Sequence, residues 1–189
     1  MTLQEKDYKK FILFFSISFI IIPLIEFISI YILLNTGVNF YGHKMLFSEL
    51  MFNSGYIPFS GILLFILLTI SVCFFLIIGV TMLKINSKSL SENILRAKKV
   101  FMIGILILIF TFLKLGYLSF LGRTLVSITG KDRTFLHMIM SSTFGPFYVT
   151  VIWLFFTGVI CFQLMSGLFL AALGLNWVLE LQKQTNQKS

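Results

Sequence analysis

The sequence predicts an all-α, polytopic membrane protein with four transmembrane helices in an up-down bundle and both termini in the cytoplasm. Of its 189 residues, 58% are hydrophobic and only 12% are charged. Soluble domains carry about 25% charged residues, so the chain falls outside that class. Several uncharged apolar runs exceed the ~18 residues that indicate a spanning helix. At this length we expect a single integral membrane domain, residues 1–189.

The direction of the chain follows from a basic connector, residues 84–99, between two uncharged apolar runs. It holds five Lys or Arg residues against the single Glu92. By the positive-inside rule this connector faces the cytoplasm. The N-terminus, connector and tail together carry ten Lys or Arg residues, and the two loops on the other side carry four. An inverted chain would oppose that bias.

The first span is expected at 11–34, directly after the basic N-terminus. The run is about twice the length of a signal-peptide core and has no small-x-small cleavage site after it, so we expect it to remain uncleaved. Pro23 is predicted to kink this helix, with Glu26 just beyond the kink.

The first outer loop, 35–58, is bounded by Asn-Thr-Gly and Asn-Ser-Gly turn sequences. Between them, residues 43–52 place Leu46, Phe47, Leu50 and Met51 on one helical face, which predicts a short interfacial helix. The second span is expected at 59–83.

The third helix is expected to begin in the connector, near Ser91. Ser89 and Glu92 have the spacing of a capping box, in which both side chains satisfy free backbone N–H groups. This helix should span the membrane over 100–122, with Lys114 inside the apolar run.

The second outer loop should turn at 130–133. Residues 134–179 then hold no charge, which is too long for one span of about 20 residues. Trp153 and Trp177 are separated by about 36 Å of helix, close to the spacing of the two aromatic belts of a bilayer. The fourth span is therefore expected at 153–177. Residues 134–152, broken at Gly145-Pro146, would be interfacial or re-entrant, and 180–189 a polar tail.

Glu26 and Lys114 are the charged residues well inside the predicted spans. Each lies about 15 residues beyond the basic residues that mark the entry of its helix, so both reach a similar depth. Pairing would relieve the cost of burying either charge alone, so we expect the two groups to meet directly or through one water. Two alternatives stay open: Lys114 snorkels to the interface, or the pair handles protons or cations.

Gln163, Gly167 and Ala171 are the predicted helix-packing residues of the fourth span. An amide near the middle of the membrane needs a partner on a neighbouring helix, and a small-xxx-small pair permits close approach, within the bundle or in a dimer. The sequences of the halves 1–90 and 91–189 show no common register. Each half has two spans and an interfacial segment, which allows at most a parallel repeat.

The two histidines, His43 and His137, fall on the outer side and are weak candidates for a metal or haem site. Neither has a second ligand at i+3 or i+4, so interfacial polar residues are the better interpretation, and no cofactor is expected. Cys73 and Cys161 are unpaired in sequence and lie in apolar runs, where small buried residues are expected.

Leu90-Ser91-Glu92-Asn93, Ile103-Gly104 and Glu180-Leu181-Gln182 resemble a family of uncharacterised four-helix bacterial inner-membrane proteins. Members of this family, known only as a domain of unknown function, are often encoded beside small helix-turn-helix regulators. The resemblance implies the four-span topology and supplies no catalytic residue.

The sequence lacks the hydrolase, zinc-protease and phosphate-loop motifs of enzymes. We therefore expect a non-enzymatic membrane protein that acts by contact, as an accessory, regulatory or immunity-type subunit of the cell (inner) membrane. The alternatives are a small dimeric transporter with Glu26 as its coupling carboxylate, and a membrane enzyme or haem protein. Expected partners are the bilayer, anionic lipids at the cytoplasmic face, and a second copy or another membrane protein. Nucleic acid is not expected, because the basic residues lie at the ends of apolar runs.

Overall fold

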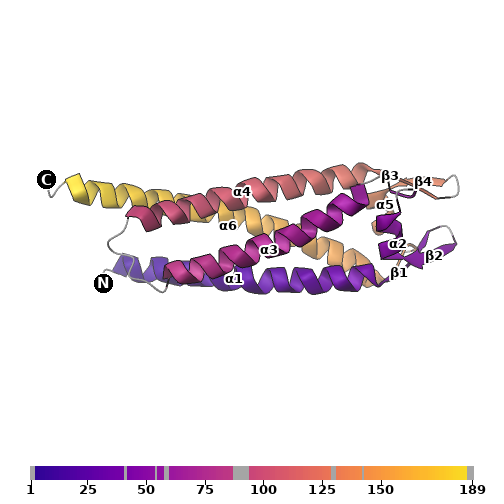
Figure 1. Cartoon of the computed structure of the whole chain (residues 1–189), viewed down its shortest axis with the longest axis horizontal. Helices are drawn as coiled ribbons and strands as arrows, with labels where there is room; N and C mark the ends of the chain where they lie inside the picture. Colours follow the sequence, from indigo (N-terminus) through magenta and orange to yellow (C-terminus); the bar gives the residue numbers. More distant parts are fainter. Residues whose placement is uncertain are drawn as a thin grey trace. The chain divides into compact units, whose positions relative to one another are not determined.

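The computed structural model describes residues 3–40, 42–53, 55–57, 60–86, 94–128, 131–141 and 143–186. Four long helices dominate it: α1 (Leu3–Leu34), α3 (Ser60–Asn86), α4 (Ile94–Arg123) and α6 (Phe147–Asn186) (Figure 1). Each is long and apolar enough to cross a membrane. The prediction of four such helices is therefore confirmed.

The helix bounds differ from the predicted spans mainly at α6. This helix already begins at Phe147, so 147–152 is not a separate segment, and it continues to Asn186 through most of the predicted polar tail. Pro146 directly precedes it, where a missing N–H costs nothing, and no proline follows to end it. The helix therefore continues through polar residues, which do not by themselves end it. The predicted capping box and the start near Ser91 lie outside the described residues.

The loop between α1 and α3 and the loop between α4 and α6 each contain a β-hairpin, which the all-α prediction missed, followed by a short helix. The first has β1 (Gly37–Phe40), β2 (His43–Leu46) and α2 (Phe47–Phe52), and the second has β3 (Leu125–Ile128), β4 (Lys131–Thr134) and α5 (Phe135–Ile139). Residues 43–46 are thus strand and not helix, and Lys131–Thr134 is a strand where a turn was expected. Strands of four residues are too short to show clear alternation.

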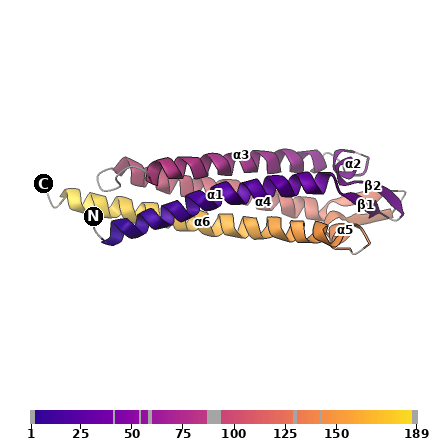
Figure 2. The same ribbon diagram turned by 90° about the horizontal axis from the view of Figure 1, so that it is seen from below.

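The chain divides into two compact units. Unit 1 comprises Met1–Pro23, Cys73–Phe112 and Cys161–Ser189, and unit 2 comprises Leu24–Val72 and Leu113–Ile160. Unit 1 is held by an apolar core in which Phe19 stacks on Phe75 at 5.5 Å between ring centroids. In unit 2 both hairpins and both short helices gather at one end of the helix segments (Figures 1 and 2). We call α2, α5 and the two hairpins the paired-hairpin head.

The second half of the chain repeats the first with an offset of 88 residues, correcting the conclusion that the halves share no register. β3, β4 and α5 each begin 88 positions after β1, β2 and α2. The hydrogen bonds repeat as well: Phe47 N–H donates to Thr36 O at 2.8 Å, and Phe135 N–H donates to Thr124 O at 2.9 Å. The α1–α3 and α4–α6 halves are therefore structural equivalents.

Two further hydrogen bonds show how the repeats are joined in unit 2. Asn39 N–H, in the first repeat, donates to Phe144 O in the second at 2.5 Å. Ser127 N–H, in the second repeat, donates to Tyr56 O in the first at 3.3 Å. Asn39 and Ser127 are equivalent positions, and so are Tyr56 and Phe144. A reciprocal contact of this kind is the mark of a twofold relation. Unit 2 is an approximate twofold assembly of two copies of one motif.

The offset is also present in the sequence, once the register is known. Identical residues recur in pairs: Thr36 and Thr124, Val38 and Val126, Phe47 and Phe135, Thr69 and Thr157, Cys73 and Cys161, Gly79 and Gly167. Elsewhere in the long helices the pattern is obscured, because one apolar residue can replace another on an exposed apolar surface.

Close helix approach in unit 1 follows the same repeat. A Cβ on Gly79 would lie 3.0 Å from Phe19 C of α1, and a Cβ on Gly167 would lie 3.0 Å from Ile107 Cγ2 of α4. The approach of α4 to α6 is closer still: a Cβ on Gly104 would lie 2.4 Å from Ala171 N, and a Cβ on Gly174 would lie 2.4 Å from Phe101 N. Gly167 and Ala171 therefore serve packing within the chain, between α4 and α6.

Gly104→Ala should destabilise the protein by about 1–3 kcal/mol, because the new methyl meets backbone that cannot move aside. Gly116→Ala is the matched control on the same helix, since a Cβ there has no atom within 4 Å. The control should be neutral or stabilise by up to ~1 kcal/mol through helix propensity. Unfolding in mild detergent measures both; equal effects would contradict the close α4–α6 contact.

Candidate functional site

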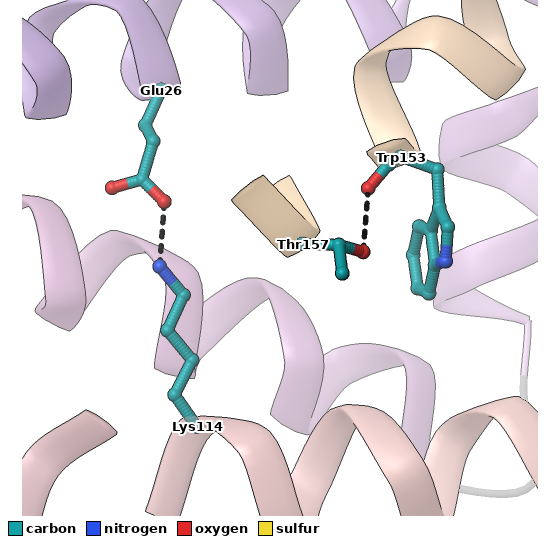
Figure 3. Close-up of polar contacts among 4 residues, drawn as sticks. All are labelled: Glu26, Lys114, Trp153 and Thr157. Carbon is teal, nitrogen blue, oxygen red and sulfur yellow. Dashed lines mark hydrogen bonds and ion pairs between the residues drawn. The ribbon is translucent and has the colours of Figure 1, made fainter. Parts of the chain in front are cut away.

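The candidate site is a buried ion pair in unit 2, between Glu26 of α1 and Lys114 of α4. Lys114 Nζ lies 2.5 Å from Glu26 Oε1, and the two side chains are 0% and 1% exposed. Figure 3 shows the carboxylate and the ammonium pointing directly at each other. The contact is a direct, charge-assisted hydrogen bond that needs no bridging water.

The repeat explains why these two residues meet. Glu26 and Lys114 are separated by 88 positions, so they are the same position in the two repeats. In a twofold assembly, a residue near the axis faces its own counterpart. Two copies of an identical repeat would place like charges together there, and the opposite signs turn that repulsion into an attraction.

The pair leaves one group unsatisfied. Glu26 Oε2 is buried and has no hydrogen-bond partner among the residues that the structure describes. Taking both ions out of water costs several kcal/mol per ion, which a single good contact does not fully offset. We therefore expect the pair to contribute more to the specific pairing of α1 with α4 than to net stability.

Two threonine hydroxyls at equivalent positions in this unit are satisfied within their own helices, whereas Ser71 Oγ is buried without a hydrogen-bond partner among the described residues. Thr157 Oγ1 donates to Trp153 O at 3.1 Å (Figure 3), and its counterpart Thr69 Oγ1 donates to Phe65 O at 2.9 Å. Trp153 and Phe65 also line a small apolar cavity of about 30 Å³. These hydroxyls are engaged with their own backbones, and the cavity offers an apolar lining.

Gln163 lies in unit 1 and is 1% exposed. Its Oε1 has no hydrogen-bond partner among the described residues, so the expected bond from a neighbouring helix does not reach this atom. Its backbone carbonyl accepts from Ser166 Oγ at 3.0 Å. Gln163 is the counterpart of Phe75, whose ring stacks on Phe19 in the first repeat.

The structure places the remaining sequence candidates on surfaces. His43 lies on β2 and His137 on α5, and both are exposed. Among the described residues, no three His, Cys, Asp or Glu side chains gather as a metal site. Cys73 and Cys161 are also exposed, so the expectation of buried cysteines was wrong. Their helical positions point outward, at equivalent places in the two repeats.

Sequence reasoning missed a polar pocket in the head. It has a volume of about 250 Å³ and is lined by Asn39, Gly42, Arg133, Met138, Ser141, Thr143 and Phe144. Both repeats contribute to it. The 88-residue repeat was the sequence signal from which the proximity of these segments could have been predicted.

Lys114→Met should destabilise the protein by about 3–5 kcal/mol, because it leaves the Glu26 carboxylate charged and buried without its partner. The double variant Glu26→Gln with Lys114→Met should lose less, since no lone charge remains. A double-mutant cycle by reversible unfolding in detergent measures the coupling. Strictly additive losses would contradict a direct pair.

The charge-reversed variant Glu26→Lys with Lys114→Glu is the control for the twofold relation. Because the two positions are equivalent, the reversed pair should retain most of the wild-type stability, and each single reversal should not. A reversed pair as unstable as the single reversals would show that the two positions have unlike surroundings.

The chain was compared with family models, curated proteins and solved structures, and no match was found in any of the three. The resemblance to four-helix inner-membrane proteins stays a prediction.

Proposed function

We propose that this protein is a non-enzymatic, multi-pass protein of the cell (inner) membrane that acts by contact, as an accessory, regulatory or immunity-type subunit. Both termini are cytoplasmic in this proposal, and the paired-hairpin head lies on the opposite side. Support for the orientation comes from the excess of Lys and Arg at the termini and the connector.

The observation that carries the proposal is the preformed head. Its inner face is fully buried, with Val38 and Val126 at equivalent positions and Phe47 packed against Phe135 at 6.4 Å between ring centroids. The reciprocal backbone bonds join its two hairpins. Such a surface loses little freedom on binding, which favours recognition of a partner.

The exposed surface of the head carries both polar and apolar side chains, the apolar ones being Leu46, Phe52, Leu125 and Leu136. It carries His43, Lys44, Glu49, Asp132 and His137. These charges are of mixed sign, and they stand on strands and short helices anchored by the buried face. Charges held by an ordered scaffold steer and select a protein partner that carries complementary charges.

Site-specific photocrosslinking tests this function. A photoreactive amino acid at Lys44, on the head, should give a discrete crosslink to one membrane protein or to a second copy in intact cells. The matched control is Ile77, an exposed α3 position in unit 1, which should give none. Equal crosslinking at the two positions would show that the head is not a contact surface.

A second candidate function is a small dimeric transporter, favoured by one observation. Glu26 Oε2 is a buried carboxylate oxygen without a hydrogen-bond partner among the described residues, and such an atom is available to a proton or a cation. Proteoliposome flux of protons or monovalent cations should then fall at least tenfold in Glu26→Gln. Flux that is unchanged in this variant, measured on folded protein, would remove the reason for this candidate.

A further inference from the structure

A groove runs along α4 and α6 in unit 2, separate from the ion pair and from the pocket in the head. Its volume is about 350 Å³, within the ~300–1,000 Å³ range of small-molecule sites. Leu118, Trp153, Phe156 and Ile160 supply apolar walls, and Arg123 lies at the end where α4 stops. Ser119 and Gly122 are the small residues of the lining, to which Leu115, Leu136 and Thr157 also contribute.

The groove is a place where the two repeats differ. The first repeat has Tyr31 where the second has Ser119, Leu34 where it has Gly122, and Asn35 where it has Arg123. Leu34, together with Phe65 and Leu68, lines a cavity of only about 30 Å³. The groove of the second repeat thus owes its size to two small residues, and its charge to one substitution at the helix end.

The lining decides the chemistry of the ligand. The apolar walls belong to α4 and α6, both apolar enough to span a membrane, so hydrocarbon is the medium that the groove meets. From Leu115, at the far end, to Arg123 is eight residues, about 12 Å of helix. The Thr157 hydroxyl in the lining already donates to Trp153 O, so an apolar chain leaves it satisfied.

We propose that this groove binds an anionic phospholipid of the bilayer, with its phosphate on the Arg123 guanidinium and one acyl chain along the apolar walls. Arg123 is exposed at the end of its helix. A guanidinium presents a planar set of donors that matches phosphate oxygens. In the proposed orientation Arg123 lies at the end of α4 next to the head, so the lipid would belong to the leaflet opposite the cytoplasm. The groove therefore offers a cation for the phosphate and an apolar surface for the acyl chain.

Trp153 provides a direct probe, because its indole lines the groove. In a Trp177→Phe background, Trp153 is the single fluorophore. The protein is reconstituted in phosphatidylcholine vesicles that contain either brominated phosphatidylglycerol or brominated phosphatidylcholine at the same low mole fraction. Quenching by the brominated phosphatidylglycerol should be at least threefold stronger.

Two variants separate the parts of the site. Ser119→Tyr with Gly122→Leu introduces the residues of the first repeat and should abolish the preference for phosphatidylglycerol; a Cβ on Gly122 has only one neighbour, at 3.6 Å. Ser119→Leu alone, at an exposed position, fills the groove if the double variant does not fold. Arg123→Asn should reduce quenching by phosphatidylglycerol to the level of phosphatidylcholine.

Asn35→Arg is the control for charge alone. It adds the cation at the equivalent helix end, where the groove is narrow, so a charge without a groove should leave Trp153 quenching unchanged. Equal quenching by the two lipids in the unmodified protein would overturn the proposal. Quenching that rises as the protein is diluted at constant lipid composition would show that a second copy covers the groove, and would also overturn it.

Discussion

Unit 2 depends on a twofold constraint, because whatever lies near the axis must be compatible with its own counterpart. Glu26 and Lys114 occupy that place, 88 residues apart, and make a direct contact. A carboxylate facing a carboxylate, or an ammonium facing an ammonium, would be repulsive and desolvated at once. Because the two positions carry opposite charges, the first repeat is complementary to the second, whereas two copies of the same repeat would bring like charges together. This favours pairing between the two halves of one chain.

The same constraint organises the head. Each hairpin is stabilised by local contacts, such as the hydrogen bond from the first residue of each short helix to the threonine that directly precedes the hairpin. Two-stranded hairpins alone are marginal in water. The reciprocal bonds between the repeats, with the buried faces of Phe47 and Phe135, join the two hairpins into one ordered surface. The proposed contact function rests on that surface.

Several equivalent positions carry residues of different size or polarity in the two repeats. Gln163 stands where the first repeat has Phe75, and Ser119, Gly122 and Arg123 stand where it has Tyr31, Leu34 and Asn35. An exchange of an aromatic for an amide, or of two bulky residues for two small ones, changes packing without disturbing the helices. The proposed lipid site depends on such an exchange, because the scaffold around it is supplied by the repeat.

The sequence by itself determined the four long helices, since composition and run length decide whether a segment suits a membrane. It also indicated the pairing of Glu26 with Lys114, because depth along a helix can be counted from the basic residues that precede it. Close packing at Gly167 and Ala171 was expected, but not whether it lay within the chain.

Only the tertiary structure decided the hairpins, the twofold relation and the groove. Strands of four residues carry too little periodicity to be recognised, and their backbone bonds join positions far apart in the chain. The register of the repeat was hidden because one apolar residue can replace another on the exposed apolar surfaces of the long helices. The groove depends on the relative sizes of the side chains on neighbouring helices, and no single segment of the sequence contains that information.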